Sequence, residues 1–532
     1  MRKRWAAAAV LAVVLWGLPG SPLADARERA GPEPPAAESP RRGPAEDAPK
    51  EDAPEEDPAR RAVFLGLLDQ EGELAVSREE AADVLRALCG PEFPQEDGED
   101  AATRRWLAER LFRFSQQQED PAEEDPGDAL DWAVEAGLFQ DMPEPGRWPE
   151  LPVSRLQLAK VLARLEGIPL PAPEEESPRD DGEIARAVDE IARKYGAVGV
   201  QVAVVEKGAV TAACPWGWAV KDSVPMTSRH MMRTASLSKV AVGLAAALLW
   251  EEGVVDYDAD IGTYWGKNAR NPRWPEEPIT IRNMLNHTST LLGSESAPWD
   301  YAGVRAGLGT PSGYGGGRPG ALESWSYNNH AFGVLGQTLE LASGRYLDDV
   351  LKDRLLTPLD AEGTFAAGEL EEPERVTPLY RASSIGRTAA SLRSVRRWSA
   401  PGATGRQFSG GFTSSAGDLA KLTAVLAGDG CFGGVRLMEA ASVARLESHD
   451  SRPLPDGSWQ ALPLRLRRDL YGRERLYYHT GSAYGVYHLL SYDPDTGDGV
   501  VVLTMGASGE KDAQGIYAVC GEISEAAYRA IR

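Results

Sequence analysis

Cysteine, basic charge and metal-binding motifs are all scarce in this chain of 532 residues. Four cysteines are too few for a disulfide-built scaffold of this size, and the sequence leaves open whether Cys214 pairs with Cys520. Neither CxxC nor HExxH occurs, and the six histidines lack metal-ligand spacing, so we expect no metal and no cofactor. Acidic residues outnumber basic ones by 80 to 57, giving a net charge of -23, which argues against nucleic acid as a partner.

Long hydrophobic runs are scarce too, and the first lies near the N-terminus. Three basic residues precede an apolar run from Trp5 to Leu18, and Ala24-Asp25-Ala26 then places small residues where a signal peptidase reads. A bilayer span needs about 20 apolar residues, so this shorter run predicts a signal peptide over residues 1–26 and a secreted protein. An uncleaved anchor helix is the alternative. No later run is long enough to span, so we expect no transmembrane helix in the mature chain.

Two acidic, proline-rich segments divide the chain. Residues 27–60 hold eight prolines and ten acids among 34 positions, with no aliphatic side chain larger than alanine. Such a segment cannot bury enough apolar area to offset its chain entropy, so we expect a disordered linker. A second linker is expected over residues 169–182, around "PLPAPEEESPRDD". The two linkers predict an accessory domain over 61–168 and a main domain over 183–532.

The accessory domain contains an internal repeat. "VSREEAADVLRAL" and "VSRLQLAKVLARL" each begin with a serine N-cap, Ser77 or Ser154, followed by a short helix with apolar positions three and four apart. Together with "ALDWAVEAGLFQDMPEPGRWPELP", this region resembles S-layer homology modules. That resemblance implies docking onto an anionic cell-wall polymer. A small helical domain without this function is the alternative.

The main domain is predicted to be α/β. "EIARAVDEIARKYG" has the pattern of an amphipathic helix, and "AVGVQVAVVEKGAVTAACPWGWAV" that of two strands joined by a hairpin at Lys207-Gly208. Near the C-terminus, "VYHLLSYDPDTGDGVVVLTM" predicts two more strands, and the last 23 residues a helix. Strands at both ends with helices between them indicate a sheet assembled from the two ends of the domain.

A serine and a lysine three residues apart stand before an uncharged run. Ser236 and Lys239 are followed by Val240 to Trp250, eleven residues without charge. Residues three apart share one face of a helix, so the amine can reach the hydroxyl. A serine needs a base to become nucleophilic, and burial makes a lysine amine such a base by disfavouring its protonated form. A solvated lysine after a helix start is the ordinary alternative.

Two further motifs follow in the chain. "WSYNNHAFGVLG" contains Tyr327-Asn328-Asn329, and "YYHTGSAYG" contains His479-Thr480-Gly481. The order S-x-x-K, Y-x-N, H/K-T-G resembles the serine β-lactamase and penicillin-binding protein superfamily over residues 183–532, and within it the class C β-lactamases, D-alanyl-D-alanine carboxypeptidases and related esterases. The resemblance implies an antiparallel sheet flanked by helices, with an inserted helical region.

The resemblance also implies roles. Ser236 would be the acylated nucleophile, Lys239 the base that activates it, and Tyr327 the relay that carries a proton to the leaving group.

The remaining site residues would bind the substrate or polarise it. Asn329 would donate its amide to the acyl side chain, and the backbone amides of the nucleophile and of Ser482 would bind the oxyanion. His479 is expected to be one of the catalytic residues. It precedes Thr480 and Gly481 and occupies the position at which the lactamases carry lysine. Neutral imidazole offers little positive charge at this position, which argues against an efficient lactamase.

The sequence therefore predicts an exported serine hydrolase that acts on a peptidoglycan peptide, as a D-alanyl-D-alanine carboxypeptidase does, with β-lactams as acylating ligands. An esterase or β-lactamase with another small acyl substrate is one alternative. A wall-bound, non-catalytic receptor is another, although an intact serine, lysine and tyrosine argue against it.

Overall fold

The computed structural model describes residues 76–89, 101–116, 129–130, 133–134, 136, 138–139, 150–153, 155–166, 182–293 and 297–531. The predicted signal peptide and first linker, and nearly all of the second linker, lie outside the described residues, as does Ser154. Among the described residues, no helix is long and apolar enough to cross a membrane.

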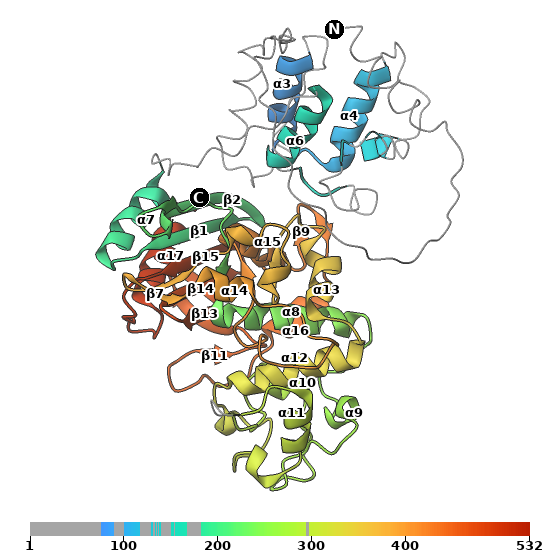
Figure 1. Ribbon diagram of the computed structural model, residues 1–532, viewed down its shortest axis with the longest axis vertical. Coiled ribbons are helices and arrows are strands. Elements are labelled where there is room, and N and C mark those ends of the chain that lie inside the picture. The colour runs from blue at the N-terminus through green and yellow to red at the C-terminus, as the bar shows by residue number, and fades with distance from the viewer. Residues whose placement is uncertain are drawn as a thin grey trace, which may run out of the picture. The chain divides into compact units, whose positions relative to one another are not determined.

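An antiparallel sheet of eight strands forms the centre of residues 182–531 (Figure 1). β1 lies beside β15, with Gly199 opposite Met505, so the prediction that both ends of the domain build one sheet is confirmed. The strands, in sheet order, are β11 (Trp459–Gln460), β12 (Arg465–Leu470), β13 (Arg473–Ala483), β14 (Val486–Asp493), β15 (Asp498–Met505), β1 (Gly199–Glu206), β2 (Ala209–Val220) and β3 (Val224–Pro225).

The hairpin between β1 and β2 turns where the sequence predicts it. Lys207 and Gly208 have φ angles of 50° and 80°. Positive φ at both central residues of a two-residue loop matches the right-handed twist of the paired strands, and glycine adopts it at little cost.

Alternate residues of the central strands face two different layers. Val200, Val202 and Val204 pack with α7 (Glu183–Lys194) and α17 (Ala518–Ala530) on one face. Ala203 and Val205 belong to the larger core on the other face. This division follows from the two-residue period of a strand and explains why β1 is apolar throughout.

Cys520 lies on the buried face of α17 as a free thiol, and its Sγ contacts the carbonyl oxygen of Tyr487 at 3.4 Å. The bridge to Cys214 that the sequence left open is therefore not formed.

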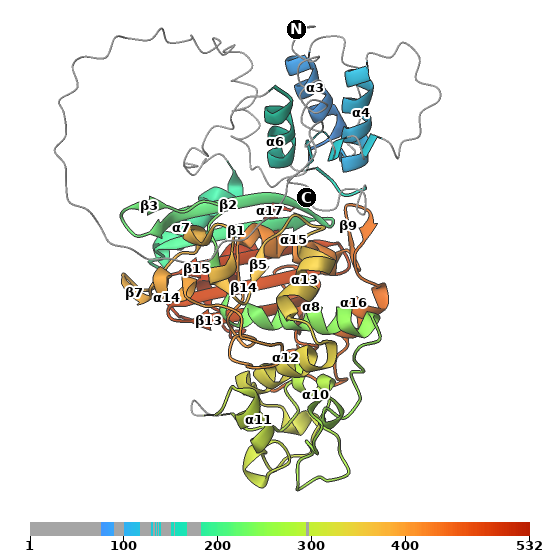
Figure 2. The same cartoon turned by 45° about the vertical axis from the view of Figure 1, so that its right-hand side comes forward.

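The uncharged run after Lys239 forms α8 (Ser238–Glu251), which is buried from Ser238 to Leu249. It lies between the sheet and the helices α10 (Ile281–Leu285), α11 (Tyr301–Gly307) and α12 (Asn329–Ser343) (Figure 2). Gly243 allows Pro463 to pack closely against α8, since a Cβ at this position would lie 2.5 Å from Pro463 Cδ. A helix that is apolar all round is expected to be buried on all sides, as this one is.

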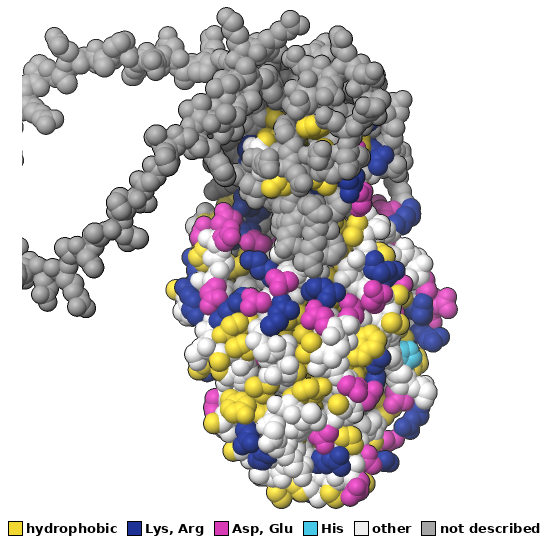
Figure 3. Space-filling model, turned by 90° about the vertical axis from the view of Figure 1, so that its right-hand side faces the viewer, with side chains coloured by type: hydrophobic (Ala, Val, Ile, Leu, Met, Phe, Trp, Pro, Cys, Tyr) yellow, Lys and Arg dark blue, Asp and Glu magenta, His cyan; other side chains and the backbone are white. Residues whose placement is uncertain are grey.

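The other elements connect α8 to the C-terminal strands and helix. They are α9 (Gly262–Trp265), α10 (Ile281–Leu285), α11 (Tyr301–Gly307), α12 (Asn329–Ser343), α13 (Leu347–Leu351), β5 (Gly363–Thr364), β6 (Leu379–Arg381), β7 (Ser384–Arg387), α14 (Ala389–Arg393), β8 (Thr413–Ser414), α15 (Ala416–Ala427), β9 (Cys431–Phe432), β10 (Val435–Arg436) and α16 (Ala440–Glu447), with β4 (Met232–Arg233) before α8. On the face drawn in Figure 3, basic and acidic side chains are interspersed.

Three short helices, α3 (Arg78–Cys89), α4 (Arg104–Gln116) and α6 (Arg155–Glu166), form the described N-terminal part. Ser77 Oγ caps α3 by accepting from the Glu80 amide at 3.1 Å, as predicted. Thr103 Oγ1 caps α4 in the same way by accepting from the Trp106 amide at 3.2 Å. The repeat therefore has a third member, which the two-copy prediction missed.

Three backbone hydrogen bonds join the starts of these helices in a closed ring. Val76 N donates to Val153 O, Ala102 N to Val76 O, and Val153 N to Ala102 O, at 2.8–3.0 Å. The three repeat members thus meet through equivalent residues.

Candidate active site

Ser236 lies in a short 3-10 turn, Ala235–Leu237, immediately before α8. Ala235 has φ of 48°, a conformation that costs free energy for a residue with a Cβ and that persists only when its surroundings hold it. Ser238 supplies part of this support, because its Oγ donates to Ala235 O at 2.6 Å and accepts from Phe412 N at 2.9 Å. The buried hydroxyl of Ser238 therefore stabilises the turn that carries Ser236.

Lys239 is fully buried, and its Nζ has three polar neighbours. They are Ser236 Oγ at 3.2 Å, Asn329 Oδ1 at 2.9 Å and Ser409 O at 2.7 Å. Burial lowers the pKa of Lys239 well below its usual value, and the positive charge of Arg233 lowers it further. Among the residues that the structure describes, no carboxylate forms an ion pair with Lys239 to offset this lowering.

The neutral amine suits this set of neighbours. A neutral lysine has two N–H groups and one lone pair. Asn329 Oδ1 and Ser409 O can only accept, so they take the two hydrogens and leave the lone pair for the hydroxyl of Ser236. The arrangement is that of a base ready to receive the serine proton.

The ring of Tyr327 covers this pair from the solvent side. Its centroid lies 4.9 Å from Lys239 Nζ, and 45% of the residue is exposed. Burial around the hydroxyl raises the pKa of Tyr327 to about 12, although a hydrogen bond with Ser236 opposes the shift. Tyr327 is therefore a neutral phenol near pH 7, able to pass a proton on but not to act as a strong base.

Asn329 begins α12. Asn328 caps this helix by accepting from Ala331 N at 3.0 Å. The carboxamide oxygen of Asn329 accepts from Lys239, as described above, so its NH2 group is the part that can donate to another partner.

His479, Thr480, Gly481 and Ser482 lie consecutively on β13, which packs against the turn of Ser236. Gly481 allows this approach, since a Cβ there would lie 2.7 Å from Thr234 O. His479 Nδ1 lies 2.7 Å from Thr480 O, which can only accept, so Nδ1 carries the hydrogen. Burial lowers the pKa of His479 to about 3, so its imidazole is neutral across the physiological range.

His287 and Ser409 also belong to this site and were not predicted. The His287 ring lies 4.6 Å from that of Tyr327, and its Nδ1 accepts from the backbone amide of Asn328 at 3.2 Å. His287 lies in "NHTST", residues 286–290, outside the three motifs on which the sequence analysis relied. Ser409 contributes a backbone carbonyl, a contact for which side-chain chemistry gives no signal.

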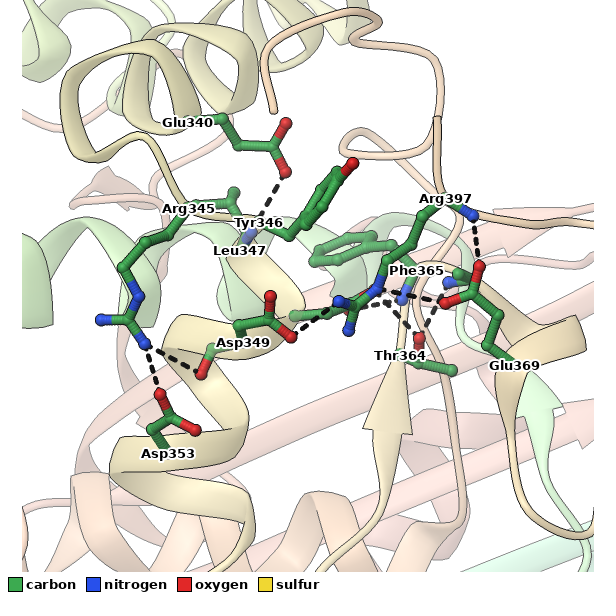
Figure 4. Close-up of polar contacts among 12 residues, drawn as sticks. Glu340, Arg345, Tyr346, Leu347, Asp349, Asp353, Thr364, Phe365, Glu369 and Arg397 are labelled. Atoms are coloured by element: carbon green, nitrogen blue, oxygen red, sulfur yellow. Dashed lines mark hydrogen bonds and ion pairs between the residues drawn. The ribbon is translucent and has the colours of Figure 1, made fainter. Parts of the chain in front are cut away.

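A buried polar network supports α12 and the loop that leads to Ser409 (Figure 4). Glu340 near the end of α12 accepts from Leu347 N at 3.1 Å and from Gly402 N at 2.6 Å. Arg397 at the start of the loop pairs with Asp349 at 2.7 Å and with Glu369 at 3.2 Å. The two acceptors of Lys239, on α12 and on the loop, thus stand on elements that are tied to each other.

Comparison with known proteins gives three kinds of match. The Beta-lactamase family model matches residues 184–519. A penicillin-binding protein of Bacillus subtilis strain 168 is 30% identical over 166 residues, which are 29% of this chain and 34% of that protein. A D-alanyl-D-alanine carboxypeptidase/endopeptidase of Escherichia coli strain K12 is 26% identical over 191 residues, 32% of this chain and 46% of that protein.

Solved structures share the fold. A class C β-lactamase from Rhodobacter sphaeroides superposes with a TM-score of 0.52 at 18% identity, covering 66% of this chain and 98% of the other. The chain spans less than half the length of the two curated relatives described above. Because the family model matches well over half of the residues, from helix α7 into α17, the chain belongs to the beta-lactamase family.

Proposed function

We propose that this protein is an exported serine hydrolase that forms an acyl-enzyme on Ser236 and acts as a D-alanyl-D-alanine carboxypeptidase. The proposal rests on the buried amine of Lys239, which lies 3.2 Å from Ser236 Oγ. The other two polar neighbours of this amine are hydrogen-bond acceptors. Such a pair suits nucleophilic catalysis, because the base removes the hydroxyl proton without a metal.

In the proposed reaction, Lys239 Nζ takes the proton of Ser236 as Oγ attacks the substrate carbonyl carbon. The oxyanion is stabilised by the backbone amides of Ser236 and Ser482. The C–N bond then breaks, and the leaving amine receives a proton through the phenol of Tyr327. Water adds to the acyl-enzyme by the reverse sequence and releases the acid with regenerated Ser236.

The neutral state of His479 argues against an efficient β-lactamase, because it offers the carboxylate of a β-lactam, like the C-terminal carboxylate of a D-alanyl peptide, a hydrogen bond and little charge. The choice of a carboxypeptidase is supported by the carboxypeptidase among the relatives of this chain. An esterase of the same fold is the second candidate, supported by the same observation.

Turnover of three substrates ranks these functions: a D-alanyl-D-alanine tripeptide, nitrocefin and p-nitrophenyl butyrate. We expect the highest kcat/KM for the tripeptide. A higher value for the butyrate ester, with the tripeptide untouched, would establish the esterase, and turnover of none would favour a non-catalytic receptor.

Replacing Tyr327 with phenylalanine should lower kcat by about 10²–10³-fold, the usual contribution of a positioned proton donor. The ring that covers Lys239 is retained in this variant, so burial of the amine is preserved and only the hydroxyl is lost. Steady-state kinetics on the tripeptide would measure the effect. The matched control is Tyr301→Phe, an exposed tyrosine on α11, for which kcat should be unchanged. Equal rates for Tyr327→Phe and wild type would exclude the relay.

We further propose that the N-terminal helices attach the protein to the cell wall. The support is the ring of hydrogen bonds joining the starts of three helices, since it extends the S-layer-homology-like repeat from two members to three. The full chain should sediment with purified Gram-positive walls and remain in solution with walls stripped of their anionic polymers. A protein lacking residues 27–181 should not sediment yet should keep its hydrolytic activity. Equal sedimentation with and without this segment would refute the attachment.

A further inference from the structure

Two arginines flank one tyrosine beyond the end of β13. The guanidinium carbons of Arg233, on β4, and of Arg387, on β7, each lie 5.3 Å from the centroid of the Tyr484 ring. Arg387 Nη1 also lies 3.4 Å from the Tyr484 hydroxyl. Tyr484 is the second residue after Ser482 along the chain. We call these three residues the arginine–tyrosine cluster.

The hairpin of β6 and β7 is held against Tyr484 by close backbone packing. A Cβ at Gly386 would lie 2.3 Å from Tyr484 O, and one at Gly485 would lie 2.2 Å from Tyr380 O. Neither position has room for a larger side chain. The place of Arg387 beside Tyr484 is therefore fixed by the fold.

The two positive charges of the cluster have no carboxylate partner among the described residues. Beside Tyr484, the side chain of Arg387 contacts Ser391 Oγ at 3.0 Å. Two guanidiniums brought to one ring repel each other, and an anion that bridges them would relieve the repulsion.

The cluster lies next to the proposed nucleophile and is open to solvent. A Cβ at Gly410 would lie 3.4 Å from Arg233 Nη2 and 3.8 Å from the carbonyl of Ala235, the residue before Ser236. The two arginines are half-buried, and Tyr484 is 37% exposed. A substrate bound at Ser236 can therefore extend to the cluster.

The direction of the substrate along β13 identifies which part reaches it. In the proposed reaction the leaving group lies near Tyr327, whose ring centroid is 6.5 Å from that of His479. The leaving group then lies at the His479 end of the four site residues on this strand. The acyl part extends the other way, past Ser482 toward Tyr484.

We propose that the arginine–tyrosine cluster binds a carboxylate on the acyl part of the substrate, so that the enzyme prefers anionic acyl groups. This inference rests on the proposed acyl-enzyme function and adds the substrate class to it. A peptide whose acyl part includes a dicarboxylic residue fits the site. Charge-assisted hydrogen bonds from two half-buried guanidiniums would give about a tenfold preference or more.

Two peptides with the same scissile bond test the proposal: D-alanyl-D-alanine tripeptides capped with acetyl or with succinyl, which adds one methylene and one carboxylate. Wild type should show kcat/KM about tenfold higher for the succinyl peptide, and Arg387→Gln should reduce this ratio to less than about twofold. The control is Arg529→Gln, an exposed arginine on α17 across the sheet, which removes the same charge and should keep the wild-type ratio. An unchanged ratio in Arg387→Gln, or no preference in wild type, would overturn the proposal.

Binding to a Ser236→Ala protein separates this inference from the proposed reaction. Calorimetry should show the succinyl peptide binding about tenfold more tightly than the acetyl peptide, and the additional change Arg387→Gln should remove the difference. Such a preference, with no turnover by wild type, would refute the hydrolase and retain the anion site. Turnover of both peptides by wild type, with equal affinities of the two for the Ser236→Ala protein, would support the hydrolase and refute the anion site.

Discussion

Replacing Ser236 with alanine should lower kcat on any substrate of this enzyme by about 10⁴–10⁶-fold, the loss found when the nucleophile of a serine hydrolase is removed. The amine of Lys239 would then have no hydroxyl within 3.2 Å to deprotonate. Substrate binding should persist, because the neighbouring Asn329 and the strand β13 are unchanged. Steady-state and single-turnover rates on the best substrate of the three ranked above measure the effect.

The control for this change is Ser312→Ala, at an exposed serine in the loop after α11. Its kcat should equal that of wild type. A Ser236→Ala protein that retained more than a hundredth of the wild-type rate, with contaminating enzyme excluded, would assign the chemistry to another group.

Replacing Lys239 with methionine should lower kcat/KM by about 10³-fold or more, because the hydroxyl would lose its base while the apolar stem is kept. Lys239→Arg should be no better. A guanidinium stays protonated and cannot accept the proton.

The pH profile of the wild type follows from the direction of the Lys239 pKa. The protonated amine cannot act as a base, so kcat/KM should fall as the pH drops through the lowered pKa. Above it, the rate should reach a plateau well below pH 10.4, the usual lysine pKa. Measurement of kcat/KM between pH 4 and 9 tests this. A rate still rising tenfold per pH unit at pH 9 would show that Lys239 is not the neutral base.

Much of this site was predictable because its chemistry is local in sequence. Ser236 and Lys239 are three residues apart on one turn, and the uncharged run after them indicated the burial that the amine needs. The pairing of the two ends of the domain also followed from strand patterns at residues 199–206 and 498–505, and the register of β1 with β15 confirms it.

The residues that the sequence analysis missed are those brought in from a distance. Ser409 lies 170 positions from Lys239 and contributes through a carbonyl that every residue has. Arg387 lies 97 positions from Tyr484, and the close packing of Gly386 and Gly485 in the fold brings them together. No period or motif in one sequence encodes such a contact.

The extent of burial was the other property that sequence patterns predicted incompletely. The sequence analysis expected a neutral His479 near pH 7 from the ordinary pKa of histidine alone. The structure shows that this ring is buried, and the burial lowers the pKa of His479 to about 3. The sequence analysis missed α4 as a third member of the repeat for a simpler reason. Ala102 and Thr103 stand there in place of the valine and serine of the other two copies.

Covalent labelling tests the central claim, that a neutral Lys239 activates Ser236 for attack on a carbonyl. Intact-protein mass spectrometry after brief exposure to benzylpenicillin should show one added penicillin per chain, located by peptide mapping on the segment that carries Ser236, and none in the Lys239→Met protein. A folded wild-type protein that stays unmodified during prolonged exposure, or that carries the adduct on another residue, would contradict the account.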